Sequence, residues 1–316
     1  MMPPRRLVAI CSVTVVVGCV GADKSRDAQS AADAAALPDK PEFTVSGFKT
    51  PESVRYDPAQ DLYFVTNING VASAKDNNGS IVRVSADGRL LDSTAAFVAG
   101  GSQGVTLNGP KGMAIVGDTL WVADIDQLRG FHRLTGAPIA SVTVKGAAFL
   151  NDVAAGPDSA IYVTDSGIHF DEKGQMSHPG PDAIVRIAGR IATIVVKFDG
   201  QPAPNGIAWE AANSRFLVNG FNSKALYAWT PGALRADSIA AGPGGGDGLE
   251  VLGGGRALYT SWADSSLNLF DGTAFRTVRK GLPSPADIGV DTKRGFVAVP
   301  LFNDNRVEVW RIPDRP

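Results

Sequence analysis

The sequence predicts an all-β protein, a six-bladed β-propeller with four antiparallel strands in each blade. Three observations lead to this prediction. Glycine and proline are frequent, at 36 and 20 of 316 residues, which is typical of many short strands joined by turns. One short motif recurs six times along the chain. Each copy is followed by β-rich runs, and the copies are spaced at roughly 40 to 60 residues, a period typical of propeller blades.

The recurring motif is a turn that leads directly into an apolar strand. Its copies begin at positions 50, 109, 149, 203, 245 and 284 and read TPESVRYD, GPKGMAIV, FLNDVAAG, APNGIAWE, GGDGLEVL and SPADIGVD. A second strand follows each copy, as in DLYFVTN and AIYVTDS, where β-branched and aromatic residues dominate. A third strand and usually a fourth come next, so each repeat predicts one four-stranded antiparallel blade.

The two ends of the repeat region are expected to meet. The last repeat ends at RVEVWRIPDRP without a fourth strand of its own. The segment PEFTVSGF, residues 41–48, precedes the first repeat and has no partner there. We therefore expect residues 41–48 to complete the last blade and close the ring, which makes residues 41–316 one propeller domain.

The region before the propeller resembles the start of an exported bacterial lipoprotein. Residues 1–18 contain two arginines and an apolar stretch that is too short to span a bilayer. The letters VVGC, which end at Cys19, resemble the lipobox in which the cysteine becomes lipidated, although cleavage elsewhere would release a soluble secreted protein. Residues 19–40 are small and polar, which predicts a flexible tether. We expect a protein on the periplasmic side of the membrane or at the cell surface, attached only through its lipid.

Composition narrows the classes of partner. The formal net charge is only −2, so nothing indicates nucleic acid or an anionic surface. Cys11 and Cys19 are the two cysteines of the chain, and cleavage at Cys19 would leave no thiol for a disulfide or a nucleophile. The expected partner is a small molecule, and the expected state is a monomer.

Alignment of the six motifs places one residue of each blade at the mouth of the central channel, because the first strand of a blade is the innermost. These residues are Glu52, Lys111, Asn151, Asn205, Asp247 and Ala286. Two carboxylates and two amides that meet on one axis are costly unless a cation lies among them. Oxygen ligands of this kind suit Ca²⁺, with Mg²⁺ or Zn²⁺ as alternatives, whereas the lack of His and Cys argues against structural zinc. Taken alone, Asn205 before a glycine would be a turn residue.

Further polar and aromatic residues are predicted to surround this mouth. The ends of the second strands contribute Asp124, Asp165 and Trp262, which we expect to line the pocket. Lys111 would either pair with Glu52 or another carboxylate or receive an anionic group of a ligand. His169 lies in DSGIHFDEKGQMSHPGPD, residues 165–182, an insertion in the third blade that is either a lid or specificity loop or an exposed loop with incidental histidines.

These motifs are similar to those of the regucalcin and gluconolactonase family of six-bladed propellers, over about residues 41–312. The resemblance rests on PES, LND, PNGIAW and GDGLEV. It implies one divalent cation held by Glu52, Asn205 and Asp247, with Asn151 beside it and Asp247 as a general base. The first blade departs from the family pattern, in which a glycine and a proline follow the glutamate. We recognise no equivalent of the arginine with which sugar-lactone members hold their substrate.

The resemblance implies a metal-dependent hydrolase that opens a lactone or ester, in which Asn151 and Asp247 are the catalytic residues. No serine lies in a nucleophile-elbow pattern, and the three histidines form no recognisable dyad by spacing. Two alternatives remain open. One is a non-catalytic binding or scaffold propeller with a structural channel metal. The other is condensation chemistry like that of strictosidine synthases, for which no catalytic glutamate can be placed.

Overall fold

The computed structural model describes residues 36–102 and 104–312, together with Met1. The expected signal peptide and the lipidation site at Cys19 lie outside these residues, apart from Met1. Within the described part of the chain, no helix has the length and apolar character needed to cross a bilayer.

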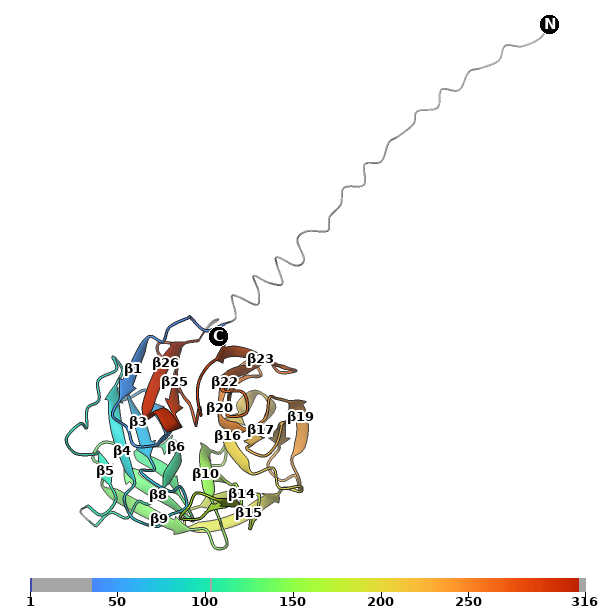
Figure 1. The fold of residues 1–316 in the computed structure, drawn as a ribbon. Coiled ribbons are helices and arrows are strands. Elements are labelled where there is room, and N and C mark those ends of the chain that lie inside the picture. Colours follow the sequence, from blue (N-terminus) through green and yellow to red (C-terminus); the bar gives the residue numbers. More distant parts are fainter. Residues whose placement is uncertain (2–35, 103, 313–316) are drawn as a thin grey trace. The chain divides into compact units, whose positions relative to one another are not determined.

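Residues 36–312 form a ring of six four-stranded antiparallel sheets, which confirms the predicted propeller (Figure 1). The first blade contains β2 (Pro51–Asp57), β3 (Leu62–Asn67), β4 (Ser80–Ser85) and β5 (Val98–Ala99). The second contains β6 (Pro110–Val116), β7 (Thr119–Asp124), β8 (Gln127–His132) and β9 (Pro138–Thr143). The third contains β10 (Leu150–Ala155), β11 (Ile161–Asp165), β14 (Ala183–Ala188) and β15 (Ile191–Lys197).

The second half of the ring repeats this order. The fourth blade contains β16 (Pro204–Glu210), β17 (Arg215–Gly220), β18 (Ala225–Trp229) and β19 (Asp237–Ala241). The fifth contains β20 (Gly246–Gly253), β21 (Arg256–Ser261), β22 (Ser266–Phe270) and β23 (Phe275–Lys280). The sixth contains β24 (Gly289–Asp291), β25 (Phe296–Leu301), β26 (Arg306–Arg311) and β1 (Phe43–Ser46). Two short 3₁₀ helices, η1 (Ala211–Asn213) and η2 (Phe302–Asp304), interrupt the connections.

The ring closes as expected, because the most N-terminal strand completes the most C-terminal blade. β1 pairs antiparallel with β26, and Phe43 lies opposite Val309 (Figure 1). Val45 of β1 is 5 % exposed and packs between the sixth and first blades. Closure by strands from both ends of the chain therefore joins the termini of the domain through backbone hydrogen bonds and a shared core.

The core of the ring is divided among the six interfaces between neighbouring blades. Each interface holds one cluster of buried side chains, and each cluster takes its members from both blades. At the interface of the third and fourth blades, for example, Tyr162 packs against Phe216 and Trp229. Both faces of most strands are buried in this way, which explains why the second strands read as nearly continuous apolar runs rather than alternating ones.

The start of the domain differs from the expected boundary. Residues up to 40 were expected to be a flexible tether, but Leu37 is 5 % exposed and lies in the cluster between the fifth and sixth blades. Its amide donates to the carbonyl of Val278 in β23, and Arg279 donates to the carbonyls of Pro38 and Asp39. The apolar leucine in an otherwise polar stretch is the physical reason for this docking.

The inner strands bulge at the residues predicted to face the channel. In each of the first five blades the pairing register between the first and second strands shifts across two residues, the channel-mouth residue and the one after it. A bulge redirects a side chain that a regular strand would place in the sheet face. Glycine follows the mouth residue in three blades, and a Cβ on Gly206 would lie 2.4 Å from the carbonyl oxygen of Asp247. Inner strands can therefore approach closely enough to bring their bulges together.

Second-strand side chains bind the amides that the bulges leave unpaired. The hydroxyls of Thr66, Thr164 and Thr260 accept the N–H groups of Ser53, Asp152 and Gly248, at 2.9, 3.0 and 2.7 Å. In the fourth blade Asn219 accepts the N–H group of Gly206 at 2.9 Å. The bulges are thus satisfied in the interior and hold the mouth residues in fixed positions.

Candidate metal centre and ligand cavity

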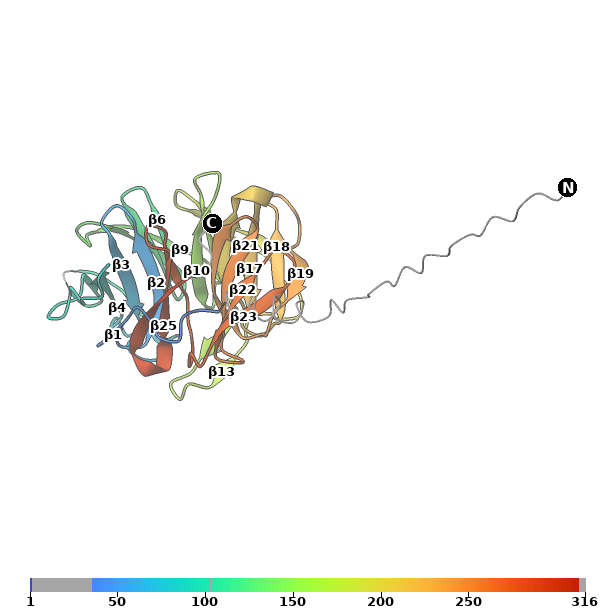
Figure 2. The same ribbon diagram turned by 90° about the horizontal axis from the view of Figure 1, so that it is seen from above.

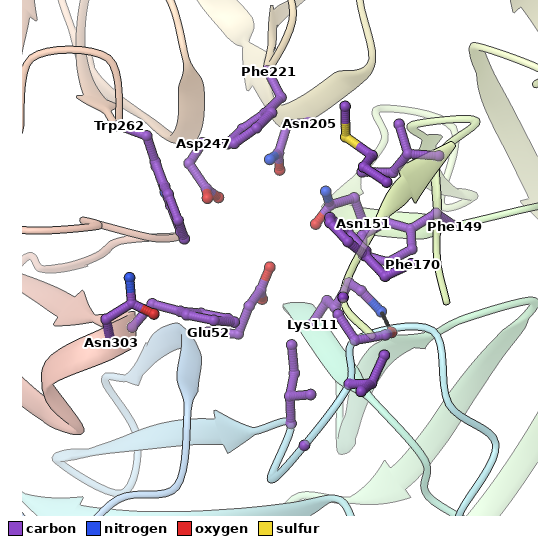
Figure 3. A pocket seen from close by; sticks show the side chains of 18 residues that line it. Glu52, Lys111, Phe149, Asn151, Phe170, Asn205, Phe221, Asp247, Trp262 and Asn303 are labelled. Atoms are coloured by element: carbon purple, nitrogen blue, oxygen red, sulfur yellow. Dashed lines mark hydrogen bonds between the residues drawn. The ribbon is translucent and has the colours of Figure 1, made fainter. Parts of the chain in front are cut away.

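A cavity of about 490 Å³ lies over one mouth of the central channel, and 18 residues line it (Figure 3). Its base consists of five of the six residues that the repeat alignment placed at the mouth. These channel-mouth residues are Glu52, Lys111, Asn151, Asn205 and Asp247. The sixth, Ala286, is buried and does not line the cavity. The cavity has the size of a small-molecule site.

Three oxygen atoms of this base are buried and have no hydrogen-bond partner. They are Oε2 of Glu52, Oδ1 of Asn205 and Oδ1 of Asp247. Figure 3 shows the polar ends of these side chains, with that of Asn151, turned toward one common space. Buried oxygens that lack donors are costly, and a divalent cation would satisfy all of them at once. The donor set therefore fits a hard cation with oxygen ligands.

Asn151 is oriented by a hydrogen-bond chain that links two blades. Its Nδ2 donates to the hydroxyl of Ser166 at 3.0 Å, and that hydroxyl donates to the carbonyl of Pro204 at 2.7 Å. Because the nitrogen of the amide is bound on one side, its oxygen is directed to the other, toward the cavity (Figure 3). Ser166 thereby selects the amide orientation that a cation needs.

The ionised forms of the two carboxylates of the base are unfavourable when no cation is present. Burial raises the pKa of Glu52 well above its usual value, and Asp247 and Asp287 raise it further, while Lys111 lowers it. Burial likewise raises the pKa of Asp247, as does Asp287, while the neighbouring polar groups of Trp262 and Asn205 lower it. Both shifts arise first from burial and then from neighbouring carboxylates, so the ionised forms are unfavourable without a positive charge between them.

Three more carboxylates lie one layer deeper in the channel together with Arg55, namely those of Asp152, Asp287 and Glu250. Asp287 accepts the hydroxyl of Ser53, and its Oδ1 has no partner. Arg55 forms an ion pair with Glu250 across the channel and lies 4.0 Å from Asp287. Burial raises the pKa of Asp287 to about 7 despite the opposing effects of Arg55 and Ser53. This layer supports the mouth and faces away from the cavity, since none of its side chains lines it.

Lys111 does not form the ion pair that we considered, which corrects that expectation. It is fully buried, and its Nζ donates to the carbonyls of Gly109 at 2.9 Å and Ala72 at 3.2 Å. The ammonium also lies 4.0 Å from the centre of the Phe149 ring. Figure 3 shows the amine turned away from the common space of the oxygens. Burial lowers the pKa of Lys111 to about 8, while Glu52 and Asp124 raise it. The bulge at Lys111 sets the direction of its side chain, and the sequence alone does not reveal the geometry of that bulge.

Asp124 and Asp165 do not line the cavity, so their expected pocket role is wrong. Asp165 accepts the amides of Ala148, Phe149 and Gly167. Asp124 accepts the amides of Asn108 and Gly109 at 3.0 and 2.9 Å and pairs with Arg129. Both aspartates end a second strand and bind the loop that enters the first strand of the same blade. The repeat therefore has side-chain oxygens at two positions. The oxygens at the start of the first strand face the cavity, whereas those at the end of the second strand bind the loop before the first strand.

The insertion of the third blade reaches the cavity, but through apolar residues rather than its histidines. It forms the hairpin of β12 (His169–Phe170) and β13 (Met176–Ser177), which projects from one face of the ring in Figure 2. Phe170 and Met176 line the cavity. His169 is absent from the lining and borders a separate hollow near Asp126. His178 pairs with Asp182 inside the loop.

Trp262 lines the cavity as expected, and it belongs to a set that the sequence reasoning missed. The residue immediately after the second strand is large and apolar in four blades that border the cavity. These residues, named here the collar, are Ile68, Phe221, Trp262 and Phe302. In the third blade the same position is Ser166, which binds Asn151. The sequence could have indicated the collar, because each of its residues comes directly after the last residue of an aligned second strand.

A metal site of the usual acidic type is not present in the described part of the chain. No three His, Cys, Asp or Glu side chains gather there in an arrangement that could hold a metal ion. The channel mouth contributes only two carboxylates, Glu52 and Asp247, and completes its oxygen set with two amides. Its fit to a cation therefore depends on the unpartnered oxygens rather than on accumulated negative charge.

Comparison with known proteins assigns the family. The model of the SMP-30/gluconolactonase/LRE-like region matches residues 50–231, more than half of the chain. The protein belongs to this gluconolactonase-like family. The match includes Glu52, Asn151 and Asn205, whereas Asp247 lies beyond its end. No protein with a curated function is significantly similar in sequence.

Solved structures support the fold of this family member. A gluconolactonase from Xanthomonas campestris is similar with a TM-score of 0.64 and 17 % identity, over 90 % of this chain and 93 % of that one. An inactive virginiamycin B lyase from Staphylococcus aureus, solved with quinupristin, is similar with a TM-score of 0.57 and 11 % identity, over 83 % and 94 %. At these identities the likeness establishes the propeller and leaves the reaction to be argued from the site.

Proposed function

We propose that this gluconolactonase-like protein is a metal-dependent hydrolase that opens a lactone or ester in the cavity over the channel. The observation that carries the proposal is the set of three unpartnered buried oxygens, from Glu52, Asn205 and Asp247, at the base of an open cavity. The family assignment supports lactone chemistry. Ca²⁺ is the cation that best suits carboxylate and amide oxygens without His or Cys, with Mg²⁺ or Zn²⁺ as alternatives.

Glu52, Asn151, Asn205 and Asp247 would hold the cation. When bound, a divalent cation supplies Lewis-acid polarisation of a carbonyl oxygen and lowers the pKa of a water molecule. Asp247 can accept the proton of an attacking water at the carboxylate oxygen that does not hold the cation. Asn151, held by Ser166, fixes the position of the reacting carbonyl. The apolar collar excludes bulk water, which strengthens the electrostatic interactions at the base.

Chelation and one substitution test this proposal together. We expect hydrolysis of a panel of lactones and aryl esters to disappear with a chelator and to return when Ca²⁺ is added. Asp247→Asn keeps the size of the side chain but removes the charge and the proton acceptor, and should lower kcat/KM by at least about 100-fold. Asp124→Asn, which alters a loop-binding aspartate outside the cavity, is the control. A folded, metal-bound protein without turnover on any member of the panel would favour a binding or scaffold propeller.

We also propose that the chain is exported and held at the membrane by a lipid on Cys19. The support is the sequence VVGC after an apolar stretch, in a segment outside the described residues. A Cys19→Ala variant should move from the membrane fraction to the soluble fraction and fail to incorporate labelled palmitate. Cys11→Ala, which alters the other cysteine, should leave both unchanged. Membrane attachment that survives Cys19→Ala would refute the anchor.

A further inference from the structure

The wall above the channel mouth differs in chemistry from its base. Of the 18 residues that line the cavity, the polar ones are almost all in the base, and the wall is built mainly from apolar side chains. No arginine is among them, and Asn303 is the single amide of the wall. The Nδ2 of Asn303 already donates to the hydroxyl of Ser284 at 2.6 Å. The indole nitrogen of Trp262 is a further donor of the wall and has no partner among the described residues. Beyond it the side chains of the wall offer few partners to a polyhydroxylated ligand.

The aromatic side chains of the collar form a continuous packed wall. Trp262 makes edge contacts with Phe221 and Phe302, with ring centres 5.6 and 5.5 Å apart. Each of the three rings comes from a different blade, and all three are partly exposed to the cavity. Because their neighbours hold them edge to face, this wall is formed before any ligand arrives.

The opposite side of the cavity is apolar as well. Phe149 and Phe170 contact each other with ring centres 5.8 Å apart, and Ile168 is buried beside them. Met176 of the β12–β13 hairpin is 47 % exposed and extends the same wall outward. A methionine at this rim can adapt its shape to an apolar chain. Figure 3 shows Trp262 and Phe221 on one side of the oxygen cluster and Phe149 and Phe170 on the other.

We propose that the ligand of this cavity is a lactone that carries a hydrocarbon substituent, such as an alkyl chain or a fused aromatic ring, rather than a sugar lactone. The inference rests on the proposed lactone or ester function and specifies its substrate class. The carbonyl lies over the oxygens of the base, and the hydrocarbon part lies between the collar and the Phe149–Phe170 pair. A sugar lactone would instead lose the hydrogen bonds that its hydroxyls make with water, with little replacement from the wall.

A homologous series tests the substrate class. The probes are δ-valerolactone and δ-lactones with alkyl side chains of three, five and seven carbons, compared with D-gluconolactone. We expect kcat/KM to rise by up to about fourfold for each methylene until the cavity is filled, because full burial of a methylene contributes about that factor. D-Gluconolactone should be the poorest member. A flat series, or a preference for D-gluconolactone, would overturn the inference while leaving lactone hydrolysis itself intact.

Two substitutions separate the wall from general effects on folding. Phe302→Ser removes a collar ring without touching the base, and should lower kcat/KM for the longest lactone about tenfold more than it lowers kcat/KM for δ-valerolactone. Phe198→Ser is the matched control, since Phe198 is a partly buried phenylalanine that packs on Tyr227 outside the cavity. An equal loss in both variants, or an equal loss on both substrates in Phe302→Ser, would contradict the proposal.

Binding of unreactive analogues gives a readout that does not depend on turnover. Alkylcyclohexanones, in which a methylene replaces the ring oxygen, cannot be hydrolysed, and calorimetry with the chain lengths used above measures their Kd. Affinity that increases with chain length supports the apolar ligand class even when no lactone is turned over. The absence of turnover would refute only the proposed hydrolase activity. Affinity that is independent of chain length refutes the inference.

Discussion

At the scale of single residues, the site depends on polar groups whose partners are either fixed by the protein or missing. Asn151 has its nitrogen bound by Ser166, whereas the oxygens of Asn205 and Asp247 are left without donors. A side chain with one bound and one free polar end is oriented before a ligand arrives. Orientation of this kind reduces the entropy that cation binding has to overcome.

Ser166→Ala tests this orientation. The substitution frees the amide of Asn151 to rotate, and leaves the carbonyl of Pro204 without its donor. We expect Ca²⁺ affinity to fall by about tenfold, since loss of such supporting hydrogen bonds commonly weakens metal binding by about 10- to 100-fold. Ser261→Ala is the control, because Ser261 ends the second strand of the fifth blade and binds only the carbonyl of Gly244. Equal Ca²⁺ affinities by calorimetry in both variants would refute the role of Ser166.

At the scale of elements, the sequence predicted the strands well and predicted side-chain directions less well. The strands were visible because apolar runs and turn residues repeat with the blade. Asp124 and Asp165 were misplaced because carboxylates occupy two repeat positions, and only the bulge in the inner strand decides which of them faces the cavity. The direction of the Lys111 side chain was also mispredicted, because it too depends on the bulge in the inner strand. The other three members of the collar, unlike Trp262, were missed because apolar residues beside strands resemble ordinary core residues.

β1 provides an element-scale prediction about closure of the ring. Val45 is buried between the last and first blades, whereas Thr44 beside it is exposed. We expect Val45→Ala to lower the free energy of unfolding by about 2 kcal/mol, because it removes two buried methyl groups and leaves a small cavity. Thr44→Ala should change it by less than about 0.5 kcal/mol. Deletion of residues 41–48 should destabilise all six blades, and unchanged urea unfolding after that deletion would refute closure by β1.

At the scale of the whole molecule, the channel concentrates buried charge on the axis that all six blades share. Glu52 and Asp247 lie at the mouth, and Asp152, Asp287, Glu250 and Arg55 lie below them. One arginine and one buried lysine do not neutralise five carboxylates. A bound cation would therefore contribute to the stability of the ring as well as to chemistry at its mouth.

The pH dependence of unfolding should reveal this balance. Burial raises the pKa of Asp287 from its usual 3.8 to about 7, so between these values the folded chain holds a proton that the unfolded chain has released. The metal-free protein should therefore lose stability as the pH rises from 5.5 to 7.5, by about 1 to 2 kcal/mol for this one group. If Ca²⁺ is held by the ionised forms of Glu52 and Asp247 as we propose, its stabilising effect should be larger at pH 7.5 than at pH 5.5. Urea unfolding at both pH values, with chelator and with Ca²⁺, measures these differences, and Asp287→Asn should reduce the metal-free dependence. A metal-free protein that is more stable at pH 7.5 than at pH 5.5 would show that burial does not raise the pKa values of the channel carboxylates.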